Sequence, residues 1–202
     1  MKFTRSTGML SGKKGFSLLE TLLVVAIILI LVGVSTRGLL PTLSAQKLSN
    51  TSSRVLDELL LARQKAITTG SPVLIRFFKQ NGNFIGFQTY VFQDGARVPA
   101  SGVSRLDEAV VIHPSPVFSS LPVNALVGNQ SDPAVPPSLQ GGVQEIREFE
   151  FRPDGSMNLS PGAEWAITLV VANPPPSPNE LPPNFVTIQV DPKTGRALMF
   201  RR

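Results

Sequence analysis

Apolar residues form one long, nearly uninterrupted block close to the start of the chain. Residues 16–34 read FSLLETLLVVAIILILVGV, in which only Glu20 is charged. A helix needs about twenty apolar residues to cross the roughly 30 Å core of a bilayer. Basic residues precede the block and only Arg37 follows it closely, which favours a cytoplasmic N-terminus. The pattern predicts a transmembrane helix over residues 16–36, with the rest of the chain on the far side of the membrane.

A helical period continues beyond this block. Small and apolar residues recur at alternating spacings of three and four, which is one face of a helix. The stripe consists of Ala45, Leu48, Ser52, Val55, Leu59, Ala62 and Ala66. Gly70 and Pro72 then end the helix. A helix from residue 17 to 69 is roughly 80 Å long, so we expect an amphipathic stem over residues 37–70 that docks on a globular domain.

Short apolar or alternating runs separated by turn sequences follow Pro72, which is typical of antiparallel strands. Asn81-Gly82-Asn83 predicts a hairpin and Pro153-Asp154-Gly155 a type I turn. The expected strands cover residues 73–79, 84–93, 110–113, 146–152, 165–172, 185–190 and 197–201. The sequence therefore predicts an α+β fold, in which a long N-terminal helix packs by its outer half on an antiparallel sheet of a head domain, residues 71–202.

Two proline-rich stretches interrupt this pattern, at about residues 114–142 and 173–184. The first exceeds ordinary connection lengths. It is either disordered or a surface that meets partners, and we favour a mobile surface.

The amino-acid composition excludes several kinds of functional site. The chain has no Cys, which excludes disulfides, thiolate metal sites and Cys nucleophiles, and its single His excludes multi-histidine metal sites. The formal net charge is +5, but Lys2, Arg5, Lys13 and Lys14 all lie in the first fifteen residues, and the remainder is nearly neutral. Targeting therefore explains the basicity better than nucleic-acid binding does. We expect no metal and no cofactor.

Residues 11–20 distinguish the apolar block from an ordinary signal peptide. Small and basic residues precede the block, whereas a signal peptidase site follows it, and Val32-Gly33-Val34 is a mediocre cleavage site. Glu20 lies inside the block, where an unpaired ionisable group costs roughly 2.5–3.5 kcal/mol on insertion scales.

The run Lys13-Lys14-Gly15-Phe16-Ser17-Leu18-Leu19-Glu20 resembles the cleavage and N-methylation motif of type IV prepilins and type II secretion pseudopilins. The resemblance implies a leader of residues 1–15, which prepilin peptidase removes after Gly15, and N-methylation of the new terminal Phe16. It also implies a pilin-like fold, a single-pass protein of the bacterial inner membrane with a periplasmic head, and later incorporation into a filament. The implied partners are the peptidase, other pilin or pseudopilin subunits, membrane lipid and the assembly platform.

Electrostatics agrees with this resemblance. Cleavage creates an ammonium group at Phe16, one helical turn from Glu20, and a carboxylate in the first turn is favoured by the helix dipole. When helices pack side by side in a filament, Glu20 of one subunit can meet the Phe16 amine of its neighbour. The alternative is a tolerated charge close to the membrane interface.

The end of the helix and the end of the chain carry a narrower resemblance. Residues 57–73 and 190–196 are similar to the corresponding segments of GspH- and FimT-like minor pseudopilins, and the combination also resembles the prepilin-like cassette protein D family of Verrucomicrobia. Arg63, within the first segment, is either a solvated helix charge or a residue docked against the sheet.

Catalytic hypotheses have little support in the sequence. His113 precedes Pro114 at the start of a loop-rich region, and no nucleophile elbow accompanies it. Glu145, Glu148 and Glu150 lie around one expected strand, where the spacing of the last two indicates a shared solvent-facing side. No Asp has the spacing of a calcium-binding loop.

The chain ends with Arg196, Arg201 and Arg202, and some FimT-like proteins bind DNA through a basic C-terminal region. Three phosphate contacts make a weak, salt-sensitive footprint. The sequence therefore favours a non-enzymatic minor pseudopilin or pilin-like subunit, with a DNA-uptake pilin and a membrane-anchored periplasmic enzyme as alternatives.

Overall fold

A long helix opens the described part of the chain. The computed structural model describes residues 16–129, 131 and 134–202, and for residues 32–41 it describes the backbone only. The chain divides into two compact units, Met1–Pro41 and Thr42–Arg202. Helix α1 (Leu18–Thr69) begins in the first unit and ends in the second. Its C-terminal end agrees with the predicted one.

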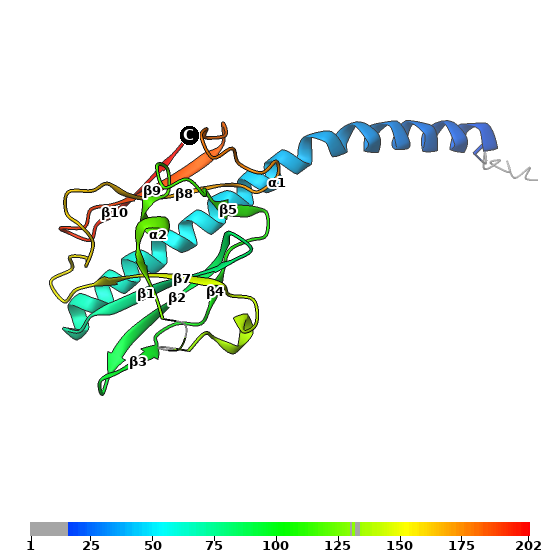
Figure 1. Ribbon diagram of the computed structural model, residues 1–202. Helices are drawn as coiled ribbons and strands as arrows, with labels where there is room; N and C mark the ends of the chain where they lie inside the picture. Colours follow the sequence, from blue (N-terminus) through cyan, green and yellow to red (C-terminus); the bar gives the residue numbers. More distant parts are fainter. Residues whose placement is uncertain (1–15, 130, 132–133) are drawn as a thin grey trace, which may run out of the picture. The chain divides into compact units, whose positions relative to one another are not determined.

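The second unit contains two antiparallel sheets (Figure 1). The larger has the order β3-β2-β1-β7-β6, with β4 also paired to β2, and the smaller has the order β10-β9-β8-β5. The strands of the larger sheet are β1 (Val73–Gln80), β2 (Asn83–Gln93), β3 (Ala96–Pro99), β4 (Ser104–Arg105), β6 (Leu126–Val127) and β7 (Glu145–Phe151). Those of the smaller are β5 (Val110–Ile112), β8 (Trp165–Val171), β9 (Phe185–Val190) and β10 (Ala197–Arg201). Every expected strand is present, but they form two sheets rather than one.

The first hairpin follows directly from its turn sequence. Strands β1 and β2 pair up to Gln80 and Asn83, with a register shift between Phe78 and Lys79, and this leaves a two-residue loop. Both loop residues have positive φ, 50° at Asn81 and 81° at Gly82. Asn-Gly is the preferred pair for this turn, because its twist matches that of the flanking strands.

The core forms where the outer half of α1 lies between the two sheets (Figure 1). From Leu48 onward the predicted stripe is the buried face, with Leu48, Val55 and Ala66 at most 1% exposed, whereas Ala45 is only partly buried. Side chains from both sheets join it in one apolar cluster; examples are Ile75, Phe77, Phe149, Ile167, Leu169 and Ile188. The predicted fold class is therefore confirmed: a long N-terminal helix packs by its outer half on antiparallel strands.

Residues 114–142 differ from the expected irregular loop. They contain α2 (Ser120–Asn124), β6 and the 3-10 helix η1 (Pro137–Leu139). Beside α2, the hydroxyl of Ser119 accepts a hydrogen bond from the Thr168 amide at 3.0 Å, so that a side chain continues the ladder of β8. Leu139 packs with Phe78 on the outer face of the larger sheet. The described part of this stretch is therefore packed on both sheets. Its apolar residues are irregularly spaced, so the sequence pattern does not predict this packing.

Two turns meet beneath the end of α1, and we call this contact the turn junction. It joins residues 152–157 to residues 191–195 through the hydrogen bond from the Met157 amide to the Pro192 carbonyl, 2.8 Å long. Arg63 Nε donates to the Thr194 carbonyl at 2.8 Å, so this side chain docks rather than lying free in solvent. The junction ties the helix to the last hairpin.

Gly195 is required at the turn junction for two reasons. Its φ is +63°, which favours glycine, and a Cβ at this position would collide with the Gly155 carbonyl oxygen. We expect Gly195→Ala to lower the free energy of unfolding by roughly 1–3 kcal/mol from backbone strain alone, with the collision adding to that loss. Urea denaturation of the detergent-solubilised chain measures it.

Gly82→Ala is the matched control, because Gly82 also has positive φ but has open space where a Cβ would stand. If Gly195→Ala lowered the free energy of unfolding no more than Gly82→Ala does, the two turns would not approach as closely as described.

Candidate processing and assembly site

The described part of the N-terminal unit is an apolar helix without a buried residue. All residues from Phe16 to Leu31 are exposed, and the large apolar side chains range from 49% exposed at Val24 and Ile27 to 84% at Leu18. A helix that is hydrophobic all round is stable only in a core, a membrane or an assembly. This segment therefore needs cover from lipid or from other helices.

Ser17 caps the start of this helix. Its hydroxyl accepts a hydrogen bond from the Leu19 amide at 3.2 Å, and its carbonyl accepts from the amides of Glu20 and Thr21 at 3.0 and 3.1 Å. Glu20 is the third residue after this cap, which is the acidic position of a capping box, and it lies in the first turn. The helix start therefore favours a carboxylate at position 20 before any partner is considered.

The predicted cleavage site lies outside the described residues. Lys13, Lys14 and Gly15 belong to the leader of residues 1–15, so leader removal and methylation of Phe16 stay predictions. The predicted membrane span extends to residues 32–36, whose side chains are likewise outside the described part. Among the described residues, no helix is both long enough and apolar enough to cross a bilayer.

Glu148 and Glu150 share a face of β7, as predicted, but that face is not freely solvated. Arg76 lies opposite Glu148 in the register of β1 and β7, is fully buried, and donates to the Glu148 carboxylate from Nε and Nη2 at 3.1 and 2.8 Å. The Glu148 side chain is only 12% exposed. Arg97 lies near both carboxylates, 3.8 Å from Glu148 and 3.6 Å from Glu150. The expectation of solvent-facing glutamates is therefore wrong for Glu148, because a buried guanidinium holds it.

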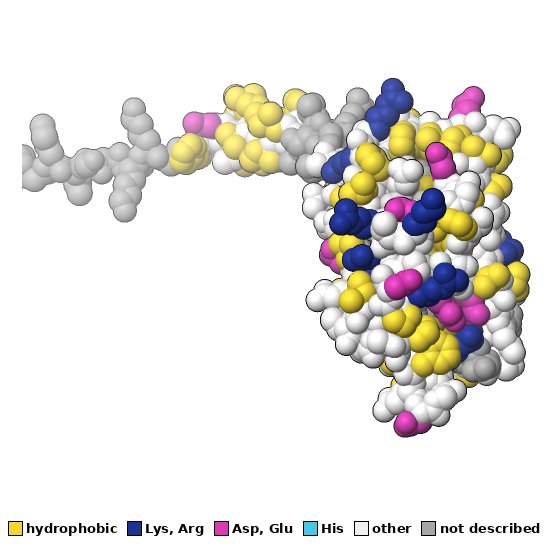
Figure 2. Space-filling model, turned by 90° about the vertical axis from the view of Figure 1, so that its left-hand side faces the viewer, with side chains coloured by type: hydrophobic (Ala, Val, Ile, Leu, Met, Phe, Trp, Pro, Cys, Tyr) yellow, Lys and Arg dark blue, Asp and Glu magenta, His cyan; other side chains and the backbone are white. Residues whose placement is uncertain are grey.

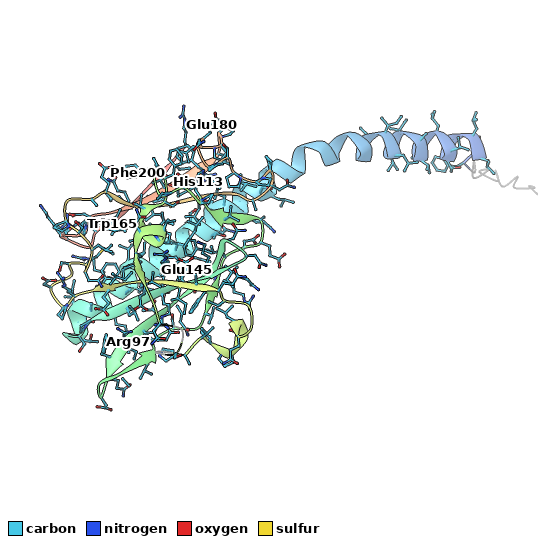
Figure 3. All side chains as sticks on the ribbon, viewed as in Figure 1. Arg97, His113, Glu145, Trp165, Glu180 and Phe200 are labelled. Atoms are coloured by element: carbon cyan, nitrogen blue, oxygen red, sulfur yellow. The ribbon has the colours of Figure 1, made fainter. Side chains whose placement is uncertain are left out.

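The third glutamate of the cluster is also neutralised by cations. Glu145 accepts from Lys79 Nζ at 2.9 Å and also pairs with Arg147, and these contacts lower the pKa of its carboxyl, with Lys79 contributing most (Figure 3). Burial raises the pKa of the nearby Tyr90 hydroxyl although the Arg76 charge opposes it. Glu145 and Glu148 therefore form ion pairs that connect β7 to β1.

His113 is a structural residue. It is fully buried, its Nδ1 accepts from the Ser115 amide at 3.2 Å, and its Nε2 lies 3.0 Å from the Ser177 carbonyl and 3.3 Å from that of Glu180 (Figure 3). These partners assign the proton to Nε2, which donates to the carbonyls. Nε2 thereby attaches the proline-rich loop of residues 173–184 to the end of β5, and Nδ1 holds the turn that follows this strand.

The three C-terminal arginines are not gathered into one basic surface. Side chains alternate along β10, so Arg196 and Arg202 lie on its outer side and Arg201 on the side of α1. Arg201 Nη1 contacts the Ser49 hydroxyl of α1 at 3.3 Å, which agrees with this assignment. Figure 2 shows basic, acidic and hydrophobic side chains interspersed on one face of the head. The arrangement does not support the DNA footprint considered from sequence.

The described chain contains no group of three or more His, Asp or Glu side chains that could hold a metal ion. Two features escaped sequence reasoning. One is the buried pair of Arg76 and Glu148, which an isolated cation among the apolar residues of β1 signals. The other is the exposed apolar strand β10, where residues 198–200 break the apolar–polar alternation of a half-buried strand.

Comparison with known proteins supports the motif. The chain matches the family described as the prokaryotic N-terminal methylation motif over residues 10–36. Two crystal structures of the type IV minor pilin FimU from Pseudomonas aeruginosa strain PAO1 are similar to this chain, each with 13% sequence identity. The first covers 77% of this chain and 89% of its own, with a TM-score of 0.47, and the second covers 76% and 92%, with a TM-score of 0.45. A comparison with the curated proteins finds no match. The chain therefore carries a prokaryotic N-terminal methylation motif on a long helix followed by antiparallel sheets.

We expect Glu148→Gln to destabilise the head strongly. The substitution keeps the shape of the side chain but removes the charge that faces the fully buried Arg76, and breaking a buried ion pair costs roughly 3–5 kcal/mol. The control is Glu150→Gln, since Glu150 is 25% exposed and lies 3.6 Å from Arg97; exposed pairs contribute about 1 kcal/mol or less. Urea denaturation of both variants gives the comparison, and equal losses would contradict the assigned role of Glu148.

Proposed function

We propose that the chain is a pilin-like structural subunit of a type IV pilus or type II secretion filament. It is made as an inner-membrane precursor with a cytoplasmic N-terminus and a periplasmic head. Prepilin peptidase removes residues 1–15 after Gly15 and methylates Phe16, and the helix that begins there then packs into a filament. The observation that carries the proposal is the methylation motif over residues 10–36, together with the exposure of every apolar side chain from Phe16 to Leu31.

Energetics explains how such a helix exchanges lipid for protein. Moving an apolar side chain from water into apolar surroundings is favourable by about 1.5–3 kcal/mol. Lipid tails and neighbouring apolar helices provide nearly the same cover, so the apolar side chains do not by themselves favour one over the other. Glu20 does distinguish them, because the lipid tails have no cation to pair with it and a neighbouring subunit has the amine of Phe16. Pairing recovers part of the roughly 2.5–3.5 kcal/mol that an unpaired carboxylate costs in the membrane.

Capping and pairing are compatible roles for Glu20. The Ser17 cap starts the helix next to the new terminus, so the carboxylate is held in the first turn close to where the amine forms. Each subunit then offers one cation and one anion at the same end of its helix. A staggered neighbour satisfies both.

A narrower proposal concerns the class of subunit. Arg63 docks on the last hairpin, and both lie in the segments that resemble GspH- and FimT-like minor pseudopilins. We therefore propose a minor subunit of that type, and the cassette protein D family as its narrower relative. The role is structural rather than enzymatic, since His113 and Glu148 already have structural partners.

Glu20→Ala tests the pairing. We expect the variant to be made, processed and retained in the membrane, because removing a charge from an apolar helix does not weaken membrane insertion. Its incorporation into sheared or detergent-extracted filaments, measured by sedimentation and immunoblotting of a tagged chain, should fall at least about tenfold, which corresponds to 1.4 kcal/mol.

Glu20→Asp keeps the charge and should retain part of the incorporation. Thr21→Ala is the matched control, since Thr21 is an exposed neighbour whose hydroxyl donates only to the Leu18 carbonyl. Incorporation of Glu20→Ala at the level of the control would contradict the proposal.

A further inference from the structure

Strand β10 is an open and unprotected sheet edge. It pairs with β9 on one side, in continuous register from Ala197 to Arg201, and with no other strand of the described chain. Three consecutive apolar residues are exposed on it: Leu198 at 63%, Met199 at 41% and Phe200 at 52%. Figure 3 marks Phe200 on this strand. Exposed apolar edge strands readily add a further strand, and proteins normally protect them.

The other sheet edges of the described chain are protected. Strand β3 carries Arg97 and ends at Pro99, and β4 and β6 have only two residues each. At the opposite end of the smaller sheet, β5 has three residues, and beyond it the hydroxyls of Ser119 and Ser120 cover the amides of β8. Strand β10 has no Pro and no bulge, and its charges stand only at its ends, at Arg201 and at the flanking Arg196 and Arg202. The contrast within one molecule indicates that this edge is kept open.

The register shows which backbone groups are available. The amide of Asp191 donates to the Arg196 carbonyl at 2.9 Å, and that of Arg202 donates to the Phe185 carbonyl at 3.3 Å. In an antiparallel ladder these groups alternate, so Leu198 and Phe200 bond to β9. The amides and carbonyls of Ala197, Met199 and Arg201 therefore point away from β9, toward the open edge.

The charges around the edge select the partner. On the outer side of β10, Leu198 and Phe200 stand between Arg196 and Arg202. A second copy pairing antiparallel about Met199, the register with most paired residues, would place Arg196 opposite Arg202 twice. Like charges directly opposite each other destabilise a strand pair. The charges therefore disfavour pairing of β10 with β10 of a second copy. They favour a partner strand that has an acidic residue at each end.

We propose that β10 accepts an extended segment of another protein, which adds a strand to the smaller sheet. That segment has apolar residues opposite Leu198 and Phe200 and acidic residues opposite Arg196 and Arg202. Main-chain hydrogen bonds supply the affinity, and the apolar and charged positions supply the specificity. The surface goes beyond the proposed structural role, and its test requires no filament.

Labelled peptides probe the edge of the full chain in detergent micelles by fluorescence anisotropy. The acidic probe is Glu-Thr-Val-Thr-Val-Thr-Glu, whose palindromic sequence presents the same side chains in either strand direction, and the control has Lys at both ends. We expect the acidic probe to bind at least about tenfold more tightly at low salt. Equal binding of the two probes would overturn the proposal.

Met199→Pro tests the backbone contribution. It removes an amide that points to the open edge and leaves the bonds to β9 in place, so the fold should be retained while the acidic probe binds at least about tenfold more weakly. A second variant, Leu198→Thr with Phe200→Thr, removes the exposed apolar contacts without adding charge and should also weaken binding of the acidic probe. Unchanged binding by either folded variant contradicts strand addition at β10.

Charge reversal completes the test. Arg196→Glu with Arg202→Glu should invert the preference, so that the Lys-ended probe binds more tightly than the acidic one. Sedimentation measures the oligomeric state of the unmodified chain and of Met199→Pro. A dimer that the substitution dissociates would identify a second copy of the chain as the occupant of the edge and would overturn the proposed partner.

Discussion

The structure depends on one constraint: the apolar segment of residues 16–31 is left exposed by the described chain, and it carries one carboxylate, Glu20. Apolar side chains accept cover from any apolar surroundings, and they do not distinguish lipid from protein. A carboxylate does, because it requires a cation or water. In the proposed function, Glu20 is therefore the group through which the helix favours a filament neighbour over lipid. The Ser17 cap places it in the first turn, where the helix dipole also favours it.

The same helix organises the head at its other end. Its buried stripe contributes to a core shared with both sheets, and Arg63 ties its last turns to the final hairpin. The close approach of Gly155 and Gly195 fixes the two turns that receive this side chain. The head consequently shares its core with the helix, and it leaves one sheet edge, β10, to which we propose that another protein adds a strand.

Periodicity was sufficient to predict the long helix, its buried face and its end, because the three- and four-residue spacing from Leu48 to Ala66 has one structural solution. The Asn81-Gly82 turn likewise determines its hairpin. Periodicity could not predict that the strands divide into two sheets, since pairing between distant segments leaves no local signal. It also missed the packing of Ser119 and Leu139, which lie among irregularly spaced prolines.

The candidate site likewise has features with a local sequence signal and features that depend on distant segments. The motif around Phe16 and Glu20 is local and was readable, and the sequence comparison agrees with it. The partners of Glu148, His113 and Arg201 lie far away in the chain. The fold was therefore needed to judge whether Glu148 faces solvent, whether His113 is catalytic and whether Arg201 is available to DNA. Arg63 is an intermediate case, because its docked state was one of two alternatives that the sequence left open.

Intact-mass and N-terminal peptide mass spectrometry of the chain purified from membranes tests the central claim most directly. The account predicts a mature chain that begins at Phe16, carries one methyl group on its terminal amine and retains the whole apolar helix. A chain that still begins at Met1 would contradict it, because the amine that pairs with Glu20 would not form. A chain that begins at residue 35 would contradict it equally, because the apolar helix would be lost and only the head would remain.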